Sequence, residues 1–176
     1  MTGSIVSNYL PKRTMYISKK ILQKYGKDEK YYTKERILLR ETGNALMATY
    51  LSEKVYSNRS LYSILITNDN VECKYVLALL NSKLLQFYYE VMFKAETDLF
   101  PKIRIAQAKL LPISFAAKEQ QQQIIDLVDK SLAAKKVDPQ VDTSDLEHRI
   151  DELVYPLYNL NPDEIAVIEG VDNVLR

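Results

Sequence analysis

The chain of 176 residues has an ordinary composition, with 47% hydrophobic and 27% charged residues and a net charge of only +1. Its length suits one domain with a real core, or one domain plus a helical appendage. The single Cys excludes an internal disulfide, and the N-terminus lacks the apolar stretch of a signal peptide. A membrane span would need about twenty nearly uninterrupted apolar residues. We therefore expect a protein of the reducing cytoplasm that does not enter a membrane.

The charges are divided unevenly along the chain. Residues 1–113 contain 18 Lys and Arg against 10 Asp and Glu, whereas residues 114–176 contain 6 against 13. A basic part suits a polyanionic partner, and an acidic part must face something else. We predict a basic body at residues 1–113 and an acidic region at residues 114–176. Solvated charge on both parts is the simpler alternative.

The segments before the longest apolar stretch predict one short helix and then strands. Ile17–Tyr25 fits a helix that stops at Gly26, followed by a polar loop. The apolar run Arg36–Arg40, bounded by charge, predicts a buried strand. β-branched and aromatic residues between turn signals predict consecutive antiparallel strands after it. These strands are expected at residues 45–51, 54–57 and 61–67, and a further strand-like segment lies at 102–105.

The longest and most apolar stretch of the chain is Lys74–Lys94, KYVLALLNSKLLQFYYEVMFK. It contains no Gly or Pro, and its apolar residues share one broad arc of a helical wheel. We predict one long helix with a wide buried face, around which the body is organised. Asn81 falls within that arc, where a hydrogen-bonded core residue is expected rather than a functional one. The arc comprises Leu77, Leu80, Leu84, Phe87, Tyr88, Val91 and Met92.

After Pro112 the pattern becomes helical. Residues 117–136, and a second segment that opens at Ser144, carry narrow apolar stripes and are joined by a short connection. This arrangement predicts an antiparallel helical hairpin. The predicted fold is therefore α/β of the α+β kind: a mixed or antiparallel sheet packed on a long central helix, followed by a C-terminal helical hairpin.

Local signals also predict how the chain ends. Pro156 should kink or end the second helix of the hairpin. Asn161 should cap a last short helix, with Pro162 at its first position, and Gly170 should end it. We expect the basic body and the hairpin to be spatially distinct, with the hairpin protruding.

No catalytic constellation can be assembled from the sequence. One His and one Cys cannot build a metal cluster, and four Gly leave no phosphate-binding loop. Asn161-Pro162 continues into Asp163-Glu164, so the Asn/Asp-Pro-Pro-aromatic tetrapeptide of amino-methyltransferases is absent. His148 is expected to be a surface or interface residue. We therefore predict a chain that binds something, holds no metal or cofactor, and is not an enzyme by itself.

Several stretches, taken in order, resemble a known family. They include RILLRETGNALMATY, KYVLALLNSKLLQFYY, LFPKIRIAQAKLLPI and LEHRIDELVYPLYNL. Over about Tyr32–Gly170 their order is similar to the C-terminal specificity domain of TaqI-like and Eco57I-like restriction-modification enzymes. These are type IIG-like DNA adenine-N6 methyltransferases, often fused to a nuclease. In that family this region is the target recognition domain, an α/β module followed by helices that reads the DNA sequence.

The resemblance implies a C-terminal fragment of a larger enzyme. An upstream domain would hold S-adenosylmethionine and the catalytic tetrapeptide, so methylation is not assigned to this chain. The expected partners are double-stranded DNA and the upstream methyltransferase or nuclease part of the same protein. Two other hypotheses remain open: a protein interaction module that uses the C-terminal hairpin, and an enzyme of unrecognised type.

Basic and amide side chains near the strand connections are the candidate DNA contacts. Arg can bind guanine O6 and N7 bidentately, and Asn can bind adenine N6 and N7. For each candidate, a surface charge or a phosphate contact without sequence information is the simpler alternative. Arg40 could also pair with a carboxylate. The candidates are Arg36, Arg40, Asn58, Arg59, Lys102, Arg104 and Lys109.

Overall fold

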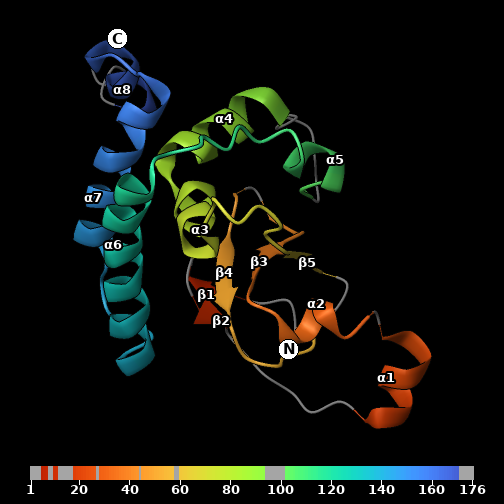
Figure 1. Ribbon diagram of the computed structural model, residues 1–176. Coiled ribbons are helices and arrows are strands. Elements are labelled where there is room, and N and C mark those ends of the chain that lie inside the picture. Colours follow the sequence, from red (N-terminus) through yellow and green to blue (C-terminus); the bar gives the residue numbers. More distant parts are fainter. Residues whose placement is uncertain are drawn as a thin grey trace.

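The protein folds into a sheet, a central helix and a helical hairpin that lie side by side (Figure 1). The computed structural model describes residues 5–7, 10–11, 18–26, 28–43, 45–57, 60–93 and 102–170. Helix α3 (Cys73–Asn81) lies between the sheet and the hairpin formed by α6 (Lys118–Val137) and α7 (Ser144–Val154). This arrangement confirms the predicted α+β fold.

The sheet has three antiparallel strands in the order β4-β3-β5. The central strand β3 (Arg36–Arg40) has the predicted bounds, while β4 (Ala48–Leu51) and β5 (Leu61–Ile64) are shorter than expected. Alternate residues of β3 serve two faces. Ile37 and Leu39 join the main core with α3, and Leu38 packs in a small cluster on the other face.

Two predicted strands are wrong. Residues 54–57 do not form a strand, because the backbone groups of Val55 make hydrogen bonds outside any sheet. Val55 O accepts from the Arg36 side chain, and Val55 N–H donates to Tyr32 O. Lys102 makes one isolated antiparallel bridge with Thr42, after which the chain enters the short helix α5 (Ile105–Ala108).

The predicted long helix is broken in two at Ser82. α3 ends at Asn81, Ser82 is extended with φ −69° and ψ 152°, and α4 (Lys83–Phe93) follows. The Ser82 hydroxyl donates to Leu79 O at 2.7 Å and accepts from Leu85 N–H at 3.3 Å, so Ser82 caps the start of α4. These hydrogen bonds stabilise the extended backbone of Ser82. The break was not expected, because the segment contains no Gly or Pro.

The break changes which side chains are buried. Ser82, which lies outside the predicted apolar arc, is 3% exposed, whereas Val91 and Met92, which belong to that arc, are 65% and 57% exposed. Asn81 is the structural residue that was expected. Its amide accepts from Ala48 N–H at 2.9 Å and donates to Ala48 O at 3.1 Å, which ties α3 to the edge of the sheet.

The C-terminal elements follow the local signals closely. α7 ends at Val154 and passes into a 3-10 turn, Tyr155–Tyr158, that contains Pro156. Helix α8 (Pro162–Glu169) is capped by Asn161, whose side chain accepts from Glu164 N–H at 3.0 Å. Gly170 then adopts a left-handed φ of 73°, which ends the helix at low steric cost.

The hairpin does not stand apart from the body, and that expectation is wrong. A single hydrophobic cluster runs from Ile37 and Leu39 of the sheet through α3 into both hairpin helices. Ile124, Val128, Ile150 and Val154 are each at most 2% exposed, because α6 packs on both α3 and α7, and α7 also packs on α4. α3 is apolar almost all round because it is covered on two sides. The division of the chain at residue 113 stays a prediction.

The N-terminal elements are small. β1 (Ile5–Ser7) pairs antiparallel with β2 (Leu10–Pro11), and α1 (Lys19–Tyr25) and α2 (Lys30–Thr33) precede β3. α1 agrees with the predicted helix and ends before Gly26. Of the helices that the structure describes, none has both the length and the apolar character that crossing a bilayer requires.

Candidate nucleic-acid interface

Three segments that are distant in sequence meet at the C-terminal end of β3. Glu41, which follows the strand, donates its N–H to Ser60 O at 2.9 Å and accepts from Ile103 N–H at 2.7 Å. The Tyr62 hydroxyl donates to Ile103 O at 3.0 Å, which fixes the same junction from β5. The segments around residues 41, 61 and 103 are therefore held together by backbone hydrogen bonds.

This junction brings predicted DNA-binding cations together. Arg40 ends β3, while Lys102 and Arg104 flank Ile103 and are exposed. Lys109, also exposed, follows α5 and lies five residues further along the chain. We call Arg40, Lys102, Arg104 and Lys109 the basic corner.

Arg40 is half-buried and weakly bound. Its Nε donates to Thr42 Oγ1 at 3.4 Å, and one terminal nitrogen lies 3.9 Å from Met47 Sδ. Among the described residues, no carboxylate pairs with it, so the expected alternative of an ion pair finds no support. Gly43, with φ 131°, turns the chain there, and a Cβ at Gly43 would lie 3.9 Å from Arg40 Cζ. The guanidinium keeps most of its donors for another partner.

One carboxylate accompanies these cations. Glu41 Oε1 lies 3.9 Å from Lys102 Nζ, with the lysine side chain 58% exposed. Exposed ion pairs of this length contribute little stability, so Lys102 can exchange this partner for a phosphate. Burial, and then the nearby Glu41, raise the pKa of Tyr62, which stays a neutral hydrogen-bond donor.

Arg36, at the other end of β3, is not a DNA contact in this structure. It is wholly buried, and its guanidinium donates to Lys34 O at 2.9 Å, Glu53 O at 3.1 Å and Val55 O at 2.6 Å. Its Nε has no partner among the described atoms, and burial lowers its pKa. Arg36 therefore holds the segment after β4 against the sheet, and its assignment to the DNA surface is corrected.

Asn58 and Arg59 lie outside the described residues. Ser60, the next residue in the chain, is hydrogen-bonded to Glu41 at the basic corner. Their assignment as DNA contacts stays a prediction.

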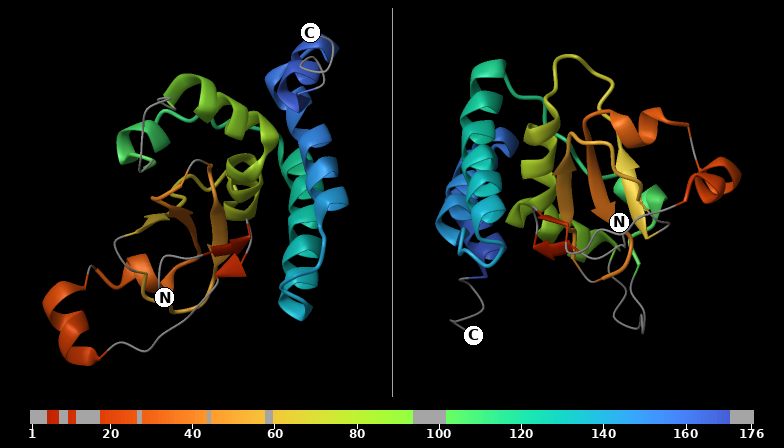
Figure 2. Two further views of the ribbon diagram at one scale, coloured as in Figure 1. Left: turned by 180° about the vertical axis from the view of Figure 1, so that it is seen from behind. Right: turned by 90° about the horizontal axis from the view of Figure 1, so that it is seen from below.

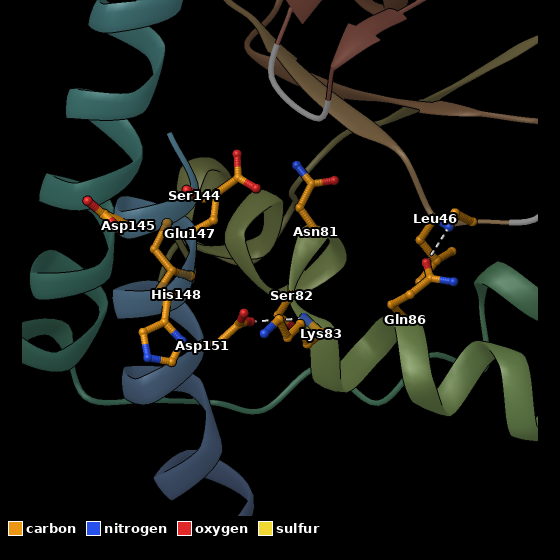
Figure 3. Close-up of a pocket in the computed structure, with 12 residues that line it drawn as sticks. Leu46, Asn81, Ser82, Lys83, Gln86, Ser144, Asp145, Glu147, His148 and Asp151 are labelled. Atoms are coloured by element: carbon orange, nitrogen blue, oxygen red, sulfur yellow. Dashed lines mark hydrogen bonds between the residues drawn. The ribbon is translucent and has the colours of Figure 1, made fainter. Parts of the chain in front are cut away.

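A second candidate site is a hollow of about 490 Å³ between α7, the break after α3, and the segment before β4 (Figure 3). Its polar side chains already serve the fold. Gln86 Oε1 accepts from Leu46 N–H at 2.7 Å, and Asp151 Oδ1 accepts from Lys83 N–H at 2.9 Å. The pKa of Asp151 is raised to about 6, mainly because its carboxylate is buried. His148 lines the hollow and lies 3.5 Å from Glu152.

The C-terminal helices neutralise part of the body's charge. Asp129 on α6 binds Lys74 at 2.6 Å, and Glu169 on α8 binds Lys83. Buried Gln121 accepts from Glu72 N–H at 3.0 Å at the start of α3, and donates to Asn70 O at 2.8 Å. The side of the body that faces these helices is therefore used for packing.

The sequence reasoning missed Glu41 and Tyr62, which organise the basic corner. Glu41 is a carboxylate directly after a basic strand end, and this signal could have marked it. Tyr62 gives no such signal, because its partner lies 41 residues away. In the part of the chain that the structure describes, no group of three or more His, Cys, Asp or Glu residues could hold a metal ion.

Comparison with known families identifies the class of the protein. The model of the TaqI-like C-terminal specificity domain matches residues 1–113. The chain belongs to this family, whose members are recognition domains of restriction-modification enzymes. Such a domain is generally non-catalytic. The match ends before the hairpin, whereas the resemblance seen in the sequence extended to about Gly170. A search among curated proteins gives no match.

Proposed function

We propose that this chain recognises the DNA sequence for a restriction-modification enzyme whose adenine-N6 methyltransferase activity lies elsewhere in the full protein. The observation that carries the proposal is the convergence of Arg40, Lys102 and Arg104 at the junction held by Glu41. S-adenosylmethionine would bind the upstream part, together with any nuclease. The cytoplasm is the proposed location, because the substrate is DNA and the chain has one free Cys.

Within the basic corner we assign two roles. Exposed Lys102, Arg104 and Lys109 are suited to phosphates, which position a protein on the duplex without reading sequence. Arg40 is better suited to a base edge, because its guanidinium is half-buried and keeps most of its donors for another partner. A guanidinium with such donors can bind guanine O6 and N7 with two parallel hydrogen bonds.

The interaction-module hypothesis is less well supported. It needs the apolar stripes of the hairpin to be offered to a partner. Those stripes are buried in the main core instead, since Ile124 and Ile150 are 1% and 2% exposed.

The test is a fluorescence anisotropy titration of a labelled duplex at several salt concentrations. The parent chain alone should bind with a dissociation constant of roughly 10⁻⁴–10⁻⁶ M near physiological salt, because the assay contains no methyltransferase part. The variant Lys102→Gln/Arg104→Gln/Lys109→Gln should bind at least about tenfold more weakly, with the log–log salt slope reduced by about two to three.

The matched control changes three exposed tail lysines, Lys118→Gln/Lys130→Gln/Lys136→Gln. Lys135 is excluded from it, because it is 6% exposed and lies 3.9 Å from Glu147. The control triple should leave affinity and salt slope unchanged. Equal losses in both triples would refute the assignment of the DNA surface, and no binding by the parent at low salt would refute DNA binding by this chain.

A further inference from the structure

Helix α1 stands clear of the rest of the molecule. Figures 1 and 2 show it projecting beyond α2 on the side away from the hairpin, in all three views. Every side chain of α1 that the structure describes is exposed, including apolar Ile21 at 48%. Its first turn is held by Ser18, whose carbonyl and hydroxyl oxygens accept from Ile21 N–H at 3.1 and 3.4 Å.

A helix of this length is not stable by itself in water. α1 has 7 residues, and isolated helices shorter than about 12–15 residues are marginal even in favourable sequences. Its sequence, KKILQKY, carries three lysines and no carboxylate. Lys20 and Lys24 are four residues apart, a spacing at which like charges repel on one helix face. A polyanion would reverse that repulsion and stabilise the helix.

The carboxylates that follow α1 do not neutralise its charge at Lys19 and Lys20. Asp28 lies 3.4 Å from Lys30, and Glu29 binds Lys54. Neither Lys19 nor Lys20 has an ion pair within the residues that the structure describes. The positive charge at Lys19 and Lys20 is therefore available to a partner in solution.

The position of α1 separates it from the basic corner. α2 anchors its end of the chain to the body, because Tyr32 is buried with its ring 4.7 Å from that of Tyr56. α2 leads into the start of β3, and the basic corner lies at the end of that strand. Five extended residues span roughly 17 Å. That distance corresponds to about five base pairs at 3.4 Å per pair, so the two elements would contact different phosphates of a duplex.

We infer that α1 is a second phosphate-binding element, which contacts duplex DNA beyond the stretch held by the basic corner and is stabilised by that contact. This inference rests on the proposed function and adds a second region of contact with the DNA. The basic corner binds near the recognised sequence, and α1 binds the sugar-phosphate backbone further along. The contact carries no sequence information, because flexible lysines bind phosphates as point charges.

The experiment uses the full chain with two loop-closed duplexes of about 7 and about 20 base pairs, or roughly 24 and 68 Å at 3.4 Å per pair. The α1 variant is Lys19→Gln/Lys20→Gln/Lys24→Gln, and the tail triple Lys118→Gln/Lys130→Gln/Lys136→Gln is its control. On the long duplex, the α1 variant should bind about tenfold more weakly, with the salt slope reduced by about two to three. On the short duplex, it should bind like the parent.

The outcomes separate this inference from the proposed function. Unchanged affinity and salt slope on the long duplex would overturn the inference alone, and would leave α1 to bind an acidic protein surface. Equal losses on the short and long duplexes would also overturn it, because α1 would then share the site of the basic corner. No binding by the parent chain to either duplex would overturn the proposed function and the inference together.

Discussion

The two sides of the body use the same residue types differently. On the hairpin side, Lys74 and Lys83 are paired with Asp129 and Glu169. On the opposite side, Lys102 has one long contact to Glu41, and Lys19 and Lys20 have no ion pair among the described residues. Net charge by sequence segment therefore overstates the basic surface of the body, and the cations relevant to DNA are those that the hairpin does not reach.

The largest effect is expected from removing the hairpin. A chain that ends at residue 117 would expose the face of α3 that packs on α6, including the partners of Ile124 and Val128. We expect no cooperative thermal transition by circular dichroism, because the core continues across the cut. A sharp melt of the shortened chain would show that residues 1–113 form an independent domain, as their charge suggested.

The next comparison is between arginines on the buried and exposed parts of the body. Arg36→Ala leaves three backbone carbonyls without their donors, so we expect a loss of about 2–4 kcal/mol of unfolding free energy. Its melting temperature should fall by about 5–15 °C. Arg104→Ala, at an exposed position, should change stability by less than about 0.5 kcal/mol and weaken DNA binding instead. Denaturant unfolding and anisotropy on both variants check this, and a reversed pattern would contradict it.

The strand Arg36–Arg40 shows how much of the fold could be predicted from the sequence. It was predicted to the residue, because an apolar run bounded by charge is a local signal. The hairpin, its Pro156 ending and the Asn161 cap were predicted for the same reason. Which of Arg36 and Arg40 is buried was not predictable, since the deciding carbonyls of Glu53 and Val55 lie 17 and 19 residues away.

The break at Ser82 depends both on a local sequence signal and on a contact between segments distant in sequence. Ser is a common helix cap, so a local signal was present in the sequence and was outweighed by the length of the apolar run. The second partner of the new helix start, Asp151, lies 68 residues away from Lys83. The contacts that complete the break therefore come from the hairpin, and the packing of the hairpin on α3 could not be derived from the stripes alone.

The pH dependence of the unfolding free energy tests the effect of the buried Asp151 carboxylate on α7. The pKa of Asp151 is about 6 in the folded chain against 3.8 as the ordinary value, mainly because of burial. The folded state therefore binds an extra proton between these values, and stability falls as pH rises from about 4 to about 6. Asp151→Asn keeps an oxygen that can accept from Lys83 N–H and removes this titration.

We expect Asp151→Asn to match the parent near pH 4 and to be more stable by about 1–3 kcal/mol at pH 7, from a shift of roughly two pKa units. The measurement is the difference between the two unfolding free energies across this pH range. A flat difference for Asp151→Asn would show that its carboxylate is not desolvated as the structure indicates.

The last comparison is between two neighbouring glutamines of α6. Gln121 is 1% exposed and joins the hairpin to Glu72 N–H, Asn70 O and Ala116 O, whereas Gln122 is exposed and bonds Asp126 on its own helix. Gln121→Ala leaves a buried donor and two acceptors unpaired, so it should lower the unfolding free energy by about 1–3 kcal/mol. Gln122→Ala should stay within about 0.5 kcal/mol of the parent. Urea unfolding of the two variants isolates the contact itself, because the substitution and the helix are the same. Equal stabilities would mean that apolar packing alone attaches the hairpin to α3.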